Sequence, residues 1–223
     1  MDTVADLVAA LAGRDDPVLT WYARDERVDF TGRTLANWTT KATNLVAGDL
    51  GLGPGDEVWL DLPGHWRTLV WAVGAWCAGA RVTLEPGEAP AVVTDSPGEA
   101  HAGLDLVVIA LPALARHVED LPSGAIDGAA DLMSQADAYV LAPEGGPDHE
   151  TGLGRTQREL LAEAPPLAEV PGAGGGGPRV LVRPDPVGQL LSAAPAIWAA
   201  GGSVVISADD DVAGAEGVTH TLA

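Results

Sequence analysis

Few residues in this chain could carry nucleotide or covalent chemistry, and lysine is among the scarcest of them. Lys41 is the single lysine among 223 residues, and it follows Thr40. A phosphate-binding P-loop needs a lysine between a glycine and a serine or threonine, so the sequence excludes one. A Schiff-base enzyme needs a lysine in a closed pocket, whereas the helical pattern around Lys41 predicts a water-facing position. We therefore expect Lys41 to be a solvated surface residue.

Other reactive side chains show no spacing typical of a catalytic site. None of the serines lies in a Gly-x-Ser-x-Gly sequence, so nothing anchors hydrolase chemistry. The histidines include no His-x-x-x-His pair. Asp148, His149 and Glu150 form a compact acidic cluster with a histidine, and two interpretations stay open: a solvated loop, or a loop that gathers them around a cation. Our prediction names no catalytic, metal-binding or cofactor-binding residue, and no cofactor.

The charge and the termini restrict the partners and the compartment. The chain has 32 acidic against 12 basic residues and a net charge of -20, which repels phosphate backbones and anionic membranes. Residues 1–6 lack the positive region of a signal peptide, and the longest apolar stretch, residues 69–80, is too short for a membrane span. Cys77 has no disulfide partner, so we expect a buried reduced thiol. We predict a cytoplasmic protein that binds neither nucleic acid nor membrane.

Residues 33–84 predict the order helix, strand, helix, strand. Thr34 is a suitable N-cap, and apolar residues recur at helical spacing until the glycine-rich stop at 51–56. A strand-helix-strand order implies a parallel pair with a right-handed crossover, adjacent or one strand apart. The expected elements that follow the first helix are a strand at 57–62, a helix at 65–78 and a strand at 81–85.

The rest of the chain continues the α/β pattern. Apolar, β-branched runs of strand length predict a sheet covered on both faces. We expect an open, mostly parallel sheet with helices on both faces. Residues 112–139 mix a short helix with turns, and the glycine-rich segment 172–177 is a flexible loop rather than a phosphate cradle. One expected helix begins at Thr156 and ends at Pro165-Pro166, and another spans 187–200. The expected strands are 91–94, 106–110, 179–182, 203–207 and 218–222.

The order of motifs in residues 33–84 resembles the opening of the adenylate-forming superfamily, the AMP-binding enzymes that include acyl-CoA synthetases, adenylation domains and luciferases. The later segments Thr156–Leu161 and Ala200–Val205 are similar to segments behind that family's phosphate loop. The resemblance implies an α/β domain like the N-terminal half of such an enzyme. The chain is most similar to a group of short actinobacterial homologues of these enzymes, and similarity to that group implies no particular reaction. The matching text is Thr34-Leu35, Gly51–Val58, Pro63–Trp66 and Ala78–Val82.

Departures from the family pattern decide the expected function. Where active members carry a glycine-rich loop with a lysine, this chain reads Pro143–Arg155, in which Asp148 and Glu150 add negative charge. The resemblance therefore implies a degenerate phosphate-loop region that includes Asp148, His149, Glu150 and Arg155, without the family's C-terminal catalytic domain. We expect a catalytically inactive, AMP-binding-like protein that binds a partner or a small ligand. The alternatives are a residual acyl-adenylate ligase completed in trans and a small hydrolase.

Two further expectations concern the ligand and the assembly. His65 and Trp66 fall at a strand-to-helix turn, where open α/β sheets present ligands, so they are the candidate ligand-facing turn. We expect residues 1–223 to form a single truncated adenylation-like domain. The alternative is two subdomains, 1–142 and 156–223, joined by the loop 143–155. We expect the runs 203–207 and 218–222 to be exposed strands, and a homodimer or protein partner to cover them. The alternative is a monomer in which residues 112–170 fold back over the same surface.

Overall fold

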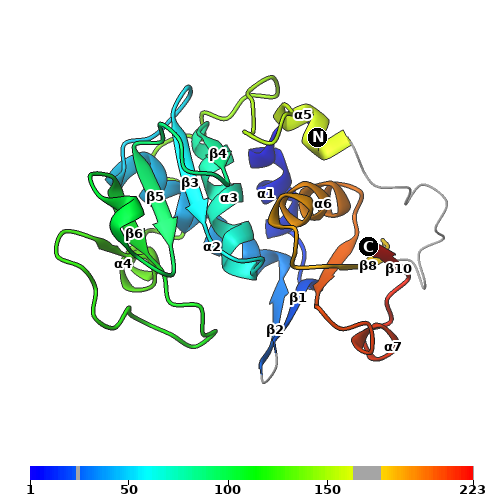
Figure 1. Ribbon diagram of the computed structural model, residues 1–223. Helices are drawn as coiled ribbons and strands as arrows, with labels where there is room; N and C mark the ends of the chain where they lie inside the picture. Colours follow the sequence, from blue (N-terminus) through cyan, green and yellow to red (C-terminus); the bar gives the residue numbers. More distant parts are fainter. Residues whose placement is uncertain (24–25, 163–176, 223) are drawn as a thin grey trace.

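The computed structural model describes residues 1–23, 26–162 and 177–222. Two five-stranded sheets lie on either side of a central layer of helices (Figure 1). The helices are α1 Val4–Ala12, α2 Gly32–Asn44 with its π-helical extension η1 Leu45–Asp49, α3 Trp66–Ala78, the 3-10 turn η2 Glu99–His101, α4 Ala130–Ser134, α5 Gln157–Ala162, α6 Val187–Ala199 and α7 Val212–Ala215.

One sheet, sheet B, is parallel throughout and runs in the order β4-β3-β5-β6-β7. Glu57 of β3 pairs with Arg81 of β4, so the predicted parallel, adjacent pair is confirmed. The chain leaves β3 for β4 on one side and then returns for β5 on the other side, so the connections change direction between β3 and β5. The strands are β3 Glu57–Asp61, β4 Arg81–Thr83, β5 Ala91–Thr94, β6 Asp105–Val108 and β7 Ile126–Asp127.

The other sheet, sheet A, runs β10-β8-β9-β1-β2 and joins distant parts of the chain. The hairpin β1-β2 is antiparallel, and β1 pairs in parallel with β9, so residues on both sides of the loop 143–155 build this sheet. The expectation that 203–207 is an exposed strand is wrong, because β9 lies between two partners and all its residues are buried. The strands are β1 Pro17–Ala23, β2 Glu26–Thr31, β8 Arg179–Val182, β9 Ser203–Ile206 and β10 His220–Leu222, the last at an edge.

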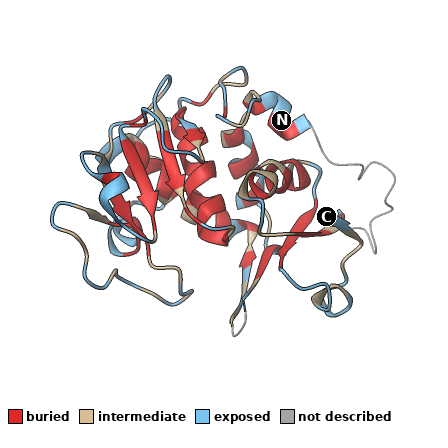
Figure 2. Cartoon of the chain, viewed as in Figure 1, coloured by how far each residue is buried: buried red, intermediate tan, exposed pale blue. Residues whose placement is uncertain are grey.

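The core lies between the two sheets, where α3 is buried along its whole length (Figure 2). Trp66, Trp71 and Trp76 of α3 are each at most 1% exposed and fill the space between α2, α6 and the sheets. Cys77 is also buried, as expected, and burial raises the pKa of its thiol to about 12. Within the described residues, no helix is both long and apolar enough to cross a membrane.

The helix starts confirm one capping prediction and correct another. Thr156 and Glu159 form the predicted reciprocal cap of α5, with the Thr156 N–H donating to the Glu159 carboxylate at 2.9 Å. The first long helix, however, begins three residues before the predicted start, because its N-cap is Thr31 rather than Thr34: the Thr31 hydroxyl accepts from the Thr34 N–H at 3.2 Å. The predicted end of α5 at Pro165-Pro166 and most of the glycine loop 172–177 lie outside the described residues.

Lys41 is not a solvated surface residue, and that prediction is wrong. Its side chain is 15% exposed, and its ammonium donates to the carbonyls of Met133 and Gln135 and pairs with Asp137 at 2.9 Å. The helical pattern placed Lys41 on the outer side of α2 without showing that the 133–137 segment crosses that side. Lys41 therefore fastens this segment to the helix.

Replacing Lys41 with methionine should lower the free energy of unfolding by about 1–3 kcal/mol, because two carbonyls and a carboxylate lose their shared donor. Urea denaturation measures the loss. Arg33→Gln is the matched control, since Arg33 pairs with Asp15 at 2.8 Å while both side chains are mostly exposed. The control should change stability by less than about 0.5 kcal/mol. Equal effects in the two variants would contradict the anchoring role.

Candidate ligand-binding site

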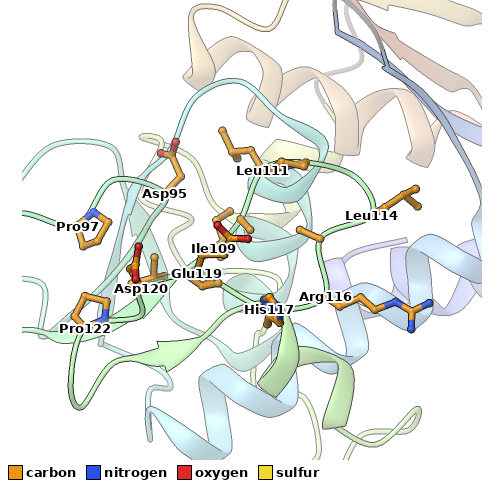
Figure 3. A pocket seen from close by; sticks show the side chains of 15 residues that line it. Asp95, Pro97, Ile109, Leu111, Leu114, Arg116, His117, Glu119, Asp120 and Pro122 are labelled. Carbon is orange, nitrogen blue, oxygen red and sulfur yellow. The ribbon is translucent and has the colours of Figure 1, made fainter.

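A crevice of about 760 Å³ opens at the carboxyl ends of β5 and β6 in sheet B. Its walls lie where each strand ends: Asp95 and Pro97 follow β5, while Val108 is the last residue of β6 and most of residues 109–122 follow it (Figure 3). Open parallel sheets bind ligands at this edge, close to the point where the connections change direction. The volume lies in the range of small-molecule sites. The crevice is therefore a candidate site for a small molecule.

Asp127, at the end of β7, holds the long wall of the crevice in place. Its carboxylate accepts from the backbone N–H of Val118 at 2.9 Å and from those of Ala129 and Ala130 at 2.9 Å each. Burial raises the pKa of Asp127, but these backbone hydrogen bonds outweigh it, so the pKa is lowered overall. One carboxylate thus joins the wall segment to the start of α4.

The opposite wall is fixed by a histidine and an aspartate. The Nδ1 atom of His101 accepts from the Gly98 N–H at 3.0 Å, which leaves the ring proton of a neutral imidazole on Nε2. Nε2 lies 3.0 Å from the carboxylate of Asp61, which also accepts from the Thr94 hydroxyl at 3.2 Å. These contacts tie the loop after β5 to the end of β3. The wall that carries Asp95 therefore rests on two neighbouring strands.

The lining combines an apolar surface with carboxylates. Asp95, Glu119 and Asp120 all line the crevice, together with Ile109. Burial, followed by the nearby Asp61 carboxylate, raises the pKa of Asp95. The lining arginine, Arg116, extends away from the other labelled side chains (Figure 3). The site therefore offers negative charge beside apolar surface, which suits a cationic ligand better than an anionic one.

His65 and Trp66, the turn predicted to face a ligand, lie inside the protein. They are 3% and 1% exposed, and the His65 ring contacts Trp21 with 4.3 Å between ring centroids. Nδ1 of His65 accepts from the Arg67 N–H at 3.1 Å and so caps α3. Burial, with a smaller contribution from the Arg67 charge, lowers the pKa of His65 to about 3. The turn is closed in this structure, and its role toward a ligand stays a prediction.

Arg67 connects this closed turn to the crevice. Its guanidinium donates to the Pro112 carbonyl at 3.2 Å and stacks on Trp66, with 4.3 Å from its central carbon to the ring. Burial lowers the pKa of Arg67 to about 10, against the attraction of Glu26. Pro112 lines the crevice, so the start of α3 helps to position the crevice wall.

The loop 143–155, predicted to be a degenerate phosphate loop, is fastened to the core at several points. Thr151 is fully buried, and its carbonyl accepts from the Trp76 indole at 2.8 Å and from the Val82 N–H at 2.9 Å. The side chain of Gln157 is equally buried and donates to the Trp76 carbonyl at 2.7 Å. A Cβ atom on Gly145 would lie 2.1 Å from that same carbonyl oxygen. The loop therefore closes the end of α3.

Backbone donors in this loop are directed to partners within the protein. The Gly146 N–H donates to Nδ1 of His149 at 3.1 Å, and the His149 N–H donates back to the Gly146 carbonyl at 3.1 Å. The Thr151 N–H donates to the Arg155 carbonyl at 2.8 Å. Asp148 and Glu150 are exposed, so the predicted negative charge does face solvent. In the described ranges no group of three histidine, cysteine or acidic residues could hold a metal ion.

Comparison with known proteins places the chain in a family. A Mycobacterium tuberculosis (strain ATCC 25618 / H37Rv) protein named TIGR03089 family protein is 32% identical over 219 residues, covering 90% of this chain and 87% of that protein. The chain belongs to the TIGR03089 family. No family model matches the sequence.

Solved structures show which fold this TIGR03089 family member has. The Brucella canis acyl-CoA synthetase superposes with a TM-score of 0.72 at 16% identity, over 99% of this chain and 47% of that one. Mycobacterium smegmatis MbtA gives 0.69 at 18% identity, over 99% and 48%. The N-terminal subdomain of Klebsiella oxytoca NpsA, in complex with 3-hydroxybenzoyl-AMSN, gives 0.66 at 13% identity, over 99% and 59%. The predicted fold, that of the N-terminal part of adenylate-forming enzymes, is confirmed, and the chain spans about half of these proteins.

The sequence pattern did not identify Asp95, Glu119 and Asp120 as site residues. The only signal was positional, because Asp95 directly follows an apolar β-branched run and therefore ends a parallel strand. Glu119 and Asp120 lie in the segment 112–139, whose path the local pattern does not determine. Their position in the crevice lining depends on the hydrogen bond between Asp127 and the neighbouring Val118, which no spacing rule reveals.

Proposed function

We propose that this protein is a catalytically inactive relative of AMP-binding enzymes that acts by binding a small ligand or a partner. The observation that supports this proposal is the loop 143–155, which carries no lysine and directs backbone donors to its own carbonyls and to His149. A phosphate cradle instead needs several N–H groups aimed at the ligand. We also propose that the family comprises short homologues of this type, since the chain covers most of its mycobacterial relative.

Electrostatics supports the same proposal. Asp148 and Glu150 are exposed on the loop, and the net charge of the chain is -20. Arg158 lies beside the loop, but it pairs with Asp2 at 3.1 Å and approaches Asp148 at 3.7 Å. A triphosphate brought to this loop would meet carboxylates of its own sign without a lysine to offset them.

Mg-ATP should produce no saturable heat in isothermal titration calorimetry and no rise in melting temperature at millimolar concentration. A ligand that binds only the folded state at 100 times its dissociation constant would stabilise it by about 2.7 kcal/mol, which is easily measured. The Brucella canis acyl-CoA synthetase serves as the comparison protein. Saturable binding of Mg-ATP to this chain, weakened by Arg155→Gln, would contradict the proposal and favour the residual ligase.

A protein partner or a homodimer remains a proposal as well. The edge strand β10 is the terminal run that stays available, because β9 is enclosed between β8 and β1. Its three residues are only partly covered, and an edge strand of this kind can pair with another chain.

A further inference from the structure

We infer that the crevice at the carboxyl ends of β5 and β6 binds a small organic cation, an ammonium group attached to an apolar body. This inference rests on the proposed binding role and names the site and the ligand class. It does not depend on nucleotide chemistry, because the crevice is lined by the loops after β5 and β6 and by none of the residues 143–155.

The apolar body has a surface to contact. Val108 and Ile109 are 2% exposed and form the inner end of the crevice, where β6 ends. Leu114 is 92% exposed, although it also lines the crevice, so a large apolar side chain faces solvent at the rim. A ligand with an apolar portion would cover part of this surface and gain about 25 cal/mol for each Å² removed from water.

The ammonium group has carboxylates to contact. Asp95 comes from the wall after β5, while Glu119 and Asp120 come from the wall after β6, so the negative charges lie on both sides of the crevice. Arg116 extends away from them (Figure 3). Asp95 is half-buried, and burial, with a smaller contribution from the Asp61 carboxylate, raises its pKa. An ammonium ion between these walls would favour the ionised form of these carboxylates.

A metal ion fits the same site poorly. In residues 1–23, 26–162 and 177–222 no three histidine, cysteine or acidic side chains gather closely enough to coordinate one ion. Hard cations need several oxygen ligands at about 2.0–2.6 Å. Carboxylates spread over a crevice of about 760 Å³ instead match a larger cation, whose charge and apolar atoms occupy different parts of the space.

The test uses 2-phenylethylamine, which is an ammonium at neutral pH, and phenylacetate, which has a similar body and the opposite charge. The chain has four isoleucines, so isoleucine-methyl NMR reports the place of binding. We expect the amine to shift the Ile109 signal saturably at millimolar concentration. Ile197 and Ile206, buried in the half of the molecule that contains sheet A, should not respond, and phenylacetate should not shift Ile109.

Substitutions then identify the carboxylates. Glu119→Gln and Asp95→Asn should each weaken amine binding about three- to tenfold, as the loss of one charged contact implies. Glu88→Gln is the matched control, because Glu88 is an exposed acid before β5, away from the crevice lining, and its loss should leave binding unchanged. The unchanged positions of the Ile197 and Ile206 signals verify that each variant is folded.

The inference is wrong if the amine gives no saturable shift, if phenylacetate binds as tightly, or if the control weakens binding as much as the crevice variants. These outcomes are separate from the test of the proposed function. If the chain binds neither the amine nor Mg-ATP, the cation site is refuted, and the proposal of a catalytically inactive protein is retained. If the chain binds both, the cation site is supported, and the proposal of a catalytically inactive protein is refuted.

Discussion

Gly145→Ala should lower the free energy of unfolding by about 3 kcal/mol or more, because the added methyl group has no space. It would lie 2.1 Å from the Trp76 carbonyl oxygen and 2.5 Å from the Gln157 amide nitrogen. Both atoms belong to the buried hydrogen bond that joins the loop 143–155 to α3. The alanine must therefore either break that bond or displace the loop from the core.

The neighbouring glycine provides the matched control for urea denaturation. A Cβ atom on Gly146 would be 3.6 Å or more from its nearest neighbours, all in the His149 ring, which is ordinary contact. Gly146→Ala should change stability by less than about 1 kcal/mol, with a small gain expected from the stiffer unfolded chain. If both variants lost stability equally, the loop would be generally intolerant of side chains, and the specific contact with α3 would not explain it.

The parallel pairing of β3 with β4 in sheet B could be predicted because the residues that determine it lie close together in the sequence. The helix 65–78 and the strands on either side of it follow one another within a short stretch, and the crossover rule fixes how they pair. Sheet A could not be predicted in the same way, since β1 pairs with β9 from the other end of the chain. Nothing in the residues 203–207 distinguishes a central strand from an edge strand, so the partner of β9 had to come from the structure.

The candidate site was less predictable than the fold. Local sequence placed His65 and Trp66 correctly at the end of a strand, but their burial depends on Trp21 and Phe30, which lie in another sheet. Lys41 was misplaced for the same reason, because a helical pattern shows which side of a helix is polar and not what covers it. The absence of a lysine from the loop 143–155 can be read from the sequence, whereas the path of residues 108–122 around the crevice cannot.

His65→Asn should remove a pH dependence of stability between about pH 6.5 and pH 3. In the folded protein the pKa of His65 is lowered to about 3 from 6.5, chiefly by burial. Between those values the unfolded chain binds a proton that the folded chain does not, so the wild type loses stability as the pH falls through this window. The loss attributable to His65 should be about 4 kcal/mol. Asparagine retains an N-cap acceptor for the Arg67 N–H but does not titrate.

The measurement is the free energy of unfolding of both proteins by urea at a series of pH values. The variant will be less stable near neutral pH, because it loses the ring contact with Trp21, so the slope against pH and not the absolute stability carries the answer. His117→Asn removes an exposed histidine and controls for the loss of one imidazole. A flatter curve for His65→Asn alone means that the turn is sealed around a neutral ring. Parallel curves for all three proteins would mean that the ring is hydrated, in which case the turn at His65 and Trp66 is open to a ligand after all.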